Sequence, residues 1–281
     1  STATISDATA TLTITDDDNP PSIDFNATSS NGAESASSKA LTVDLSAASG
    51  LDVTVNYVVT GTATGSGTDF TLANGTLTIS AGDTSGTITI ASIVNDSSAE
   101  NNETVIVTLS SPGNASLGSD KTHTYTINDN DATPSLSIND VSGNETAGNR
   151  QFTVTLSAAS GLAVTVNYAT SDGTATAGAD YTAISATQLT IAAGATTATF
   201  NVGVLADSLD EANETATLTL SSATNASISD ATATLTITDD DNPPSLSIND
   251  VSAANEDATN REFTVTLSAA SSLEVTVNYA T

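Results

Sequence analysis

The 281-residue sequence contains no cysteine, no methionine and no tryptophan, and it has a single histidine. Without cysteine, the chain forms neither a disulfide framework nor a metal site built on thiolates. Catalysis by a nucleophile and a histidine would depend on His123 alone, which we expect to be an ordinary surface residue. Aromatic residues make up only 4% of the chain, and the aromatic platforms usual in sugar-cleaving sites are therefore scarce. We expect a protein that is not an enzyme.

Positive charge is also scarce. Lys and Arg number 4 against 33 Asp and Glu, which gives a formal net charge of −29. Such an acidic surface repels phosphate groups, so we expect no direct binding of nucleic acid. The apolar runs are far shorter than the roughly 20 residues of a membrane span, so we expect no direct insertion into a membrane. Apolar residues nevertheless make up 38% of the chain and alternate regularly, which indicates a folded protein rather than a disordered one.

The sequence repeats internally. Residues 134–142 (PSLSINDVS) recur at 244–252, 110 residues later, and residues 5–18 are identical to residues 228–241. A looser copy of the same start lies at Pro21. Because self-similarity of this kind indicates repeated structural units, we expect a piece of a longer array. The predicted parts are the last strand of a preceding repeat at 1–18, whole repeats at 19–131 and 132–241, and the first strands of a following repeat at 242–281.

Within a repeat, apolar and polar residues alternate with the period of two that is typical of half-buried strands. In the second repeat this alternation predicts seven strands, at 136–138, 152–156, 164–168, 189–191, 200–204, 216–220 and 233–237. The outward positions are mostly threonine, which favours an extended backbone. The sequence therefore predicts an all-β fold of tandem seven-stranded antiparallel β-sandwiches.

Acidic residues occupy the loops that such a sandwich brings to one end. If each strand reverses direction, the loops after the first, third and fifth strands meet the end of the seventh at one pole. In the second repeat these places carry nine acids: Glu145, Asp180, Asp207, Asp210, Glu211, Glu214, Asp239, Asp240 and Asp241. Two carboxylates about 4 Å apart repel each other by roughly 4 kcal/mol at an effective dielectric constant near 20. Protons, water or cations must therefore lie between them.

Oxygen ligands without histidine or cysteine favour a hard cation. The flexible shell of about 6–8 oxygens that calcium accepts suits loops better than the tight octahedron of magnesium, so Ca²⁺ is the expected cofactor. The alternative is that the acids are solvated turn residues, because Asp and Asn are common in turns. For any single Asp, a solvated turn is the better interpretation. For acids that converge from four segments, we favour a bound cation.

Three segments of the second repeat resemble Calx-beta domains: 173–181 (GTATAGADY), the acidic run 207–214, and the ending 235–241 (LTITDDD). Because the other parts of the chain repeat the second unit, the resemblance extends over the whole chain. It implies an immunoglobulin-like sandwich that binds calcium at one pole, with the nine acids named above as the ligands.

The first repeat departs from this pattern, because serines and an alanine replace acids in its acidic run and its last acidic triplet reads Asp-Asn-Asp. Its candidate ligands are Glu34, Asp69, Asp96, Glu100, Glu103, Asp129 and Asp131. Fewer acids predict weaker or fewer calcium ions there. In the partial repeats, the corresponding acids are Asp16, Asp17, Asp18, Glu256 and Asp257.

We predict a calcium-binding structural segment of a stiff extracellular or cell-surface stalk, adhesin or filament. Calcium would cancel the repulsion at each pole and brace the Pro-containing junction between repeats, with Asp140 or Asp250 as further donors. The expected partners are neighbouring repeats of the same chain and, through edge strands that lack Lys and Pro, other copies that assemble into filaments. Two alternatives stay open: an adhesion module that binds a ligand directly, and a calcium-sensing regulatory module.

Overall fold

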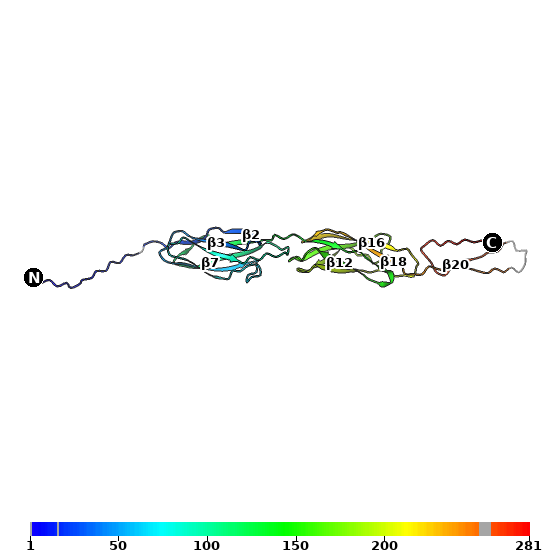
Figure 1. The fold of residues 1–281 in the computed structure, drawn as a ribbon, viewed down its shortest axis with the longest axis horizontal. Coiled ribbons are helices and arrows are strands. Elements are labelled where there is room, and N and C mark those ends of the chain that lie inside the picture. The colour runs from blue at the N-terminus through cyan, green and yellow to red at the C-terminus, as the bar shows by residue number, and fades with distance from the viewer. Residues whose placement is uncertain (1, 16, 253–259) are drawn as a thin grey trace. The chain divides into compact units, whose positions relative to one another are not determined.

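The computed structural model describes residues 2–15, 17–252 and 260–281. The candidate acids Asp16, Glu256 and Asp257 lie outside these ranges. The chain divides into two compact units, residues 1–96 with 101–130 and residues 97–100 with 131–281. Both units are built of strands, as Figure 1 shows, and the only helical element in the described ranges is the 3-10 turn η1 (Glu145–Ala147). No helix among the described residues has the length and apolarity to cross a membrane.

The first unit holds two sheets. Their strand orders are β6-β3-β1-β8 and β2-β9-β7-β4-β5. The strands are β1 (Ser22–Phe25), β2 (Ser29–Ala33), β3 (Ser38–Leu45), β4 (Val53–Gly61), β5 (Gly75–Ile79), β6 (Ser85–Ala91), β7 (Glu103–Gly113), β8 (Ser116–Leu117) and β9 (Thr122–Asn128). Alternate side chains of both sheets, such as Val43 and Val107, meet in one buried apolar cluster, which makes the unit a β-sandwich.

The second unit repeats this architecture, with the strand orders β15-β12-β10-β17 and β11-β18-β16-β13-β14. Its strands are β10 (Ser135–Ile138), β11 (Val141–Asn144), β12 (Arg150–Leu156), β13 (Val164–Asp172), β14 (Thr187–Ile191), β15 (Thr197–Val202), β16 (Glu214–Thr224), β17 (Ser227–Ile228) and β18 (Thr232–Thr238). In its core, Phe200 stacks against Phe152 and Tyr168, with ring centroids 5.7 and 3.8 Å away.

The structure confirms the all-β sandwich, and each of the seven predicted strands has a counterpart. It adds two short strands per repeat, β2 and β8 in the first and β11 and β17 in the second. These four make parallel pairs, with β9, β1, β18 and β10 respectively. The pairing is therefore mixed rather than purely antiparallel.

The first strand of the second repeat changes sheets between β10 and β11. Two side chains fix this crossover: Asn139 Oδ1 accepts a hydrogen bond from the Thr153 N–H, and Asp140 Oδ1 accepts one from the Thr234 N–H, both at 2.7 Å. The chain then pairs with β18 from Val141 onward. As a result, η1 begins beside the end of β18.

The prediction that His123 is a surface residue is wrong. Its side chain is 4% exposed, and the ring nitrogens hydrogen-bond with Ser30 Oγ at 2.8 Å and with the Ala27 carbonyl. The reason is its position in β9, where residues 123, 125 and 127 all face the core. His123 is therefore a core residue with both of its ring nitrogens satisfied.

The segments outside the two sandwiches contain little regular structure. The described residues before Ser22 form no strand, and among those after Asp241 the strands are β19 (Leu246–Ile248) and β20 (Val265–Leu267), which pair antiparallel. The assignment of 1–18 and 242–281 to further repeats stays a prediction.

Candidate metal centres

Carboxylates converge at one pole of the second repeat. They come from η1, from the loop before Tyr181, from the residues after β18, from the first residue of β16, and from residues 205–213 between β15 and β16, here called the acidic loop. Two groups of three form there, and the ligand oxygens of each group lie within 4.8 Å of one another. We call them the Glu145 group (Glu145, Asp207 and Asp241) and the Glu214 group (Asp180, Glu211 and Glu214).

The Glu145 group contains buried oxygens that lack a hydrogen-bond partner. Glu145 is 7% exposed, and its Oε1, together with Asp241 Oδ2 and the neighbouring Asp239 Oδ1, has no partner. Burial raises the pKa of Glu145 to about 7, together with Asp241, which hydrogen-bonds with Glu145 only when a proton lies between them, and with the negative charges of Asp241, Asp207 and Asp239. Without a cation, this carboxyl group therefore holds its proton far above its usual range.

Burial and neighbouring carboxylates also raise pKa values in the Glu214 group. Burial, and then the hydrogen bond and charge of Asp180, raise the pKa of Glu214 to about 7, with a further contribution from Glu211. Burial and the charges of Asp207 and Asp180 raise the pKa of Glu211 as well. Asp180 is oriented locally, because its Oδ2 accepts the Thr176 N–H at 2.6 Å.

Three of the nine candidates lie outside these two groups. Asp210 is buried, and its Oδ2 accepts a hydrogen bond from Ser271 Oγ at 2.7 Å. Asp240 accepts hydrogen bonds from Asn144 Nδ2 and Thr146 Oγ1. Asp239 belongs to neither group, but its charge acts on Glu145. Of the further donors proposed for the junction, Asp140 is engaged with the Thr234 N–H instead.

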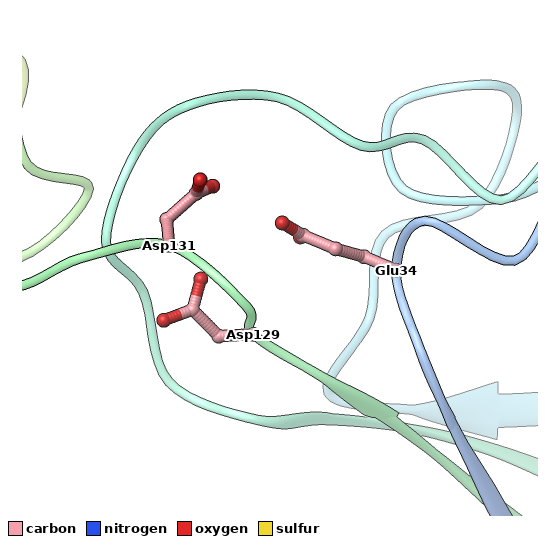
Figure 2. Close-up of side chains that lie close together, drawn as sticks. All are labelled: Glu34, Asp129 and Asp131. Carbon is pink, nitrogen blue, oxygen red and sulfur yellow. The ribbon is translucent and has the colours of Figure 1, made fainter.

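In the first repeat, Glu34, Asp129 and Asp131 form one group with ligand oxygens within 4.8 Å. Figure 2 shows the three side chains lying close together, with oxygen atoms of all three directed into the space between them. We call this the Glu34 group. Its acids occupy places in the repeat equivalent to Glu145, Asp239 and Asp241.

The other candidates of the first repeat form no second group among the described residues: Asp69, Asp96, Glu100 and Glu103. Asp69 keeps the local geometry of Asp180, since its Oδ2 accepts the Thr64 N–H at 2.5 Å. Glu100 lies against Gly161, where a Cβ would be 2.3 Å from its Oε1. The described residues thus form one acidic group in the first repeat and two in the second. This difference is in the direction expected if the first repeat binds calcium more weakly. The number of calcium ions bound stays a prediction.

Two asparagines that the sequence analysis did not single out position the terminal acids. Asn213 Oδ1 accepts the Asp239 N–H, and in the first repeat Asn102 Oδ1 accepts the Asp129 N–H, both at 3.1 Å. Each asparagine directly precedes an acid at the start of β16 or β7. An Asn-Glu pair occurs at this place in both repeats, and this recurrence could have pointed to the two asparagines from the sequence alone. They orient the backbone at the pole and are not themselves candidate ligands.

This arrangement fits a hard cation. Every group offers only carboxylate oxygens, several of them partly or fully buried, and the Glu145 group adds buried oxygens that no hydrogen bond satisfies. A divalent ion would supply the missing partner and favour the ionised carboxylates. Three acids per group would supply part of a calcium shell, with backbone carbonyls and water as further oxygen donors.

Solved structures with a similar fold include "Crystal structure of CBD12 from CALX1.2" (TM-score 0.38, 18% identity, covering 77% of this chain and 99% of that one). Another is "Crystal structure of calcium binding domain CBD12 of CALX1.1" (TM-score 0.37, 20% identity, covering 72% and 80%). A third is "Crystal structure of Apo-form Calx CBD1 domain" (TM-score 0.37, 23% identity, covering 39% and 100%). No curated protein matches the chain significantly.

The family comparison covers most of the sequence. The Calx-beta domain matches twice, at residues 16–131 and 128–241. Calx-beta domains are non-catalytic and often bind calcium. The chain belongs to the Calx-beta family and carries two of its domains in tandem.

Proposed function

We propose that the chain is a calcium-binding structural segment of an extracellular or cell-surface protein, in which calcium stabilises the poles of the sandwiches and stiffens a stalk, adhesin or filament. The observation that carries the proposal is the Glu145 group. Glu145 Oε1 and Asp241 Oδ2 are buried without a hydrogen-bond partner in the middle of negative charge. Such atoms are costly to bury unless a cation or proton satisfies them.

The magnitude of the effect supports a structural role. Each close carboxylate pair costs up to roughly 4 kcal/mol at an effective dielectric constant near 20, whereas a whole domain is stable by only about 5–15 kcal/mol. A ligand that binds only the folded state adds about 2.7 kcal/mol when its concentration is 100-fold above its dissociation constant. Millimolar extracellular calcium would therefore decide how stable the second repeat is.

The repeated sequence favours scaffolding over regulation. A sensor passes its signal to a different domain, whereas both matched segments of this chain are Calx-beta domains. The expected partners are neighbouring repeats and, through exposed edge strands, other copies of the chain. Ligand binding by an adhesion module and calcium sensing are the competing functions.

The test compares the chain in calcium and in EDTA. Isothermal calorimetry should detect calcium binding, the melting temperature should rise in calcium, and small-angle scattering should give a longer and narrower distance distribution. The variant Glu145→Gln should lose part of the calorimetric signal, whereas the control Asp230→Asn, in a turn outside the groups, should bind as the parent does. Unchanged melting and scattering on addition of calcium would refute the proposal.

A further inference from the structure

A short turn with the same internal geometry occurs three times in the chain. We call it the serine turn, and its copies are Ser49–Leu51, Ser160–Leu162 and Ser271–Leu273. In each copy the leucine N–H donates to the serine Oγ at 3.1 Å. The turn is therefore preorganised by its own sequence, in which serine and leucine stand two residues apart.

Two of the three copies, both within the second unit, donate hydrogen bonds to a backbone carbonyl of an acidic loop: the loop at 205–213, or its counterpart between β6 and β7, which we also call an acidic loop. The Ser160 Oγ–H and the Gly161 N–H donate to the Ala99 carbonyl at 3.0 and 3.2 Å. In the same way, the Ser272 N–H donates to the Asp210 carbonyl at 3.1 Å, and the Ser271 Oγ–H, which lies 2.7 Å from Asp210 Oδ2, is shared with that carbonyl at 3.2 Å.

The contacts at Ala99 and at Asp210 also share their backbone pairing and their burial. Ala99 bridges to Ser160, and Asp210 bridges to Ser271, in the parallel sense. Ala99 and Asp210 are both buried, as is Ser160 at 1% exposure. The same pair of donors on one carbonyl at two separate positions identifies a recurring docking contact rather than an accident of one loop.

The third copy of the turn, in the first unit, has no such cover among the residues that the structure describes. Within these residues, a Cβ on Gly50 would meet nothing within 4 Å, whereas at the equivalent Gly161 it would lie 2.3 Å from Glu100 Oε1. Leu51 is 62% exposed, and a hollow of about 560 Å³ adjoins the turn and Pro20. The place that the acidic-loop segment Ser97–Glu100 fills beside Ser160 is open beside Ser49.

We propose that Ser49–Leu51 is a docking surface for the acidic loop of another Calx-beta repeat. The carbonyl equivalent to those of Ala99 and Asp210 would accept the Ser49 Oγ–H and the Gly50 N–H. The occupant follows from the two seated copies, whose partner is the acidic loop in each case. The inference rests on the repeat architecture and not on calcium binding, because both donors contact a neutral carbonyl.

The chain allows a clean disulfide-trapping test. In the part of the chain that the structure describes, both apolar cores consist of residues between Ile23 and Ile237, so a chain ending at Asp241 keeps both cores and frees the carbonyl of Asp210. The sequence has no cysteine, so an introduced thiol is unique. The Ser271 Oγ and Asp210 Oδ2 atoms are 2.7 Å apart, so the two side chains are neighbours, and these two positions are chosen for the cysteines.

The full chain carrying Ser49→Cys is mixed with the 1–241 chain carrying Asp210→Cys in a glutathione redox buffer with enough salt to screen the net charge. We expect the mixed disulfide to form up to about tenfold faster than with Ser119→Cys, another exposed serine, since the Gly50 N–H hydrogen bond, which Ser49→Cys leaves in place, favours the docked pair. Adding Gly50→Gln, which the open space at Gly50 tolerates, should lower the rate to that of the Ser119 control.

Two further measurements complete the test. The double variant Asp210→Cys, Ser271→Cys of the full chain should close an intramolecular disulfide, which verifies the seated geometry. All rates are measured in EDTA and in calcium, and we expect trapping in both, so loss of calcium binding and loss of docking are scored separately. The inference is overturned if Ser49→Cys reacts no faster than Ser119→Cys, if Gly50→Gln has no effect, or if the double variant stays reduced.

Discussion

In EDTA, the second repeat should lose stability as the pH rises from about 4.5 to 7. The folded-state pKa of Glu145 is about 7 against an ordinary 4.5, so in this range the folded chain keeps a proton that the unfolded chain has released. The folded state binds more protons, and the free energy of unfolding therefore falls with rising pH. At 1.36 kcal/mol per pKa unit, Glu145 alone corresponds to roughly 3 kcal/mol. Glu214 acts in the same direction, but it is partly exposed and contributes less after solvent screening.

The assay is urea unfolding at pH 5 and pH 7.5, followed by hydrogen exchange of peptides from β12 and β16. With a urea slope of about 1–3 kcal/mol per molar, the midpoint should fall by about 1–3 M between these pH values. General charge repulsion acts in the same direction, so Glu145→Gln is the matched control and should show a clearly smaller fall. In millimolar calcium the dependence should reverse, because deprotonation creates the ligands. An EDTA midpoint that is equal or higher at pH 7.5 would refute the reasoning.

Three further predictions concern single side chains. Asp241→Asn should weaken calcium binding in the second repeat about tenfold or more by calorimetry, whereas Asp230→Asn should not. Tyr181→Phe removes the hydroxyl that donates to Asp172 Oδ1 at 2.6 Å in a buried position, and should destabilise the second repeat by about 1–3 kcal/mol in urea. His123→Ala removes a buried ring and both of its hydrogen bonds, and should cost the first repeat about 2–4 kcal/mol; equal losses in both repeats by hydrogen exchange would contradict this local account.

The strands could be predicted where the core is apolar and alternating. Phe152, Val154 and Leu156 are all buried in β12, as the period of two requires. The short strands β11 (VSGN) and β2 (SSNGA) were missed because Gly, Ser and Asn give no apolar alternation, and only pairing with β18 or β9 makes them extended. Tertiary pairing overrides local preference at such segments.

The histidine could have been placed correctly. His123 alternates with Tyr125 and Ile127 in the sequence THTYTIN, so the period that identified the strand also predicts an inward ring. A residue's position in a strand is the stronger guide to its burial.

The sequence predicts that the acids gather at one pole of the repeat, but it does not predict which of them form each group of three. Strand parity brings the four acidic segments together, and the structure does so. Parity does not distinguish Asp207, which faces Glu145, from Asp210, three residues later, which turns to Ser271. Which side of a loop an acid faces depends on backbone angles that composition does not specify.

The parallel pairing of β11 with β18 has a mechanical consequence. The four residue pairs from Val141–Leu235 to Asn144–Thr238 run side by side in the same direction. If the repeat is pulled at its two ends, β11 and β18 are drawn lengthwise past each other, so their hydrogen bonds bear the load together rather than opening one after another. The short strand that the sequence pattern did not reveal is thus the one that ties the entry of the repeat to its exit under tension.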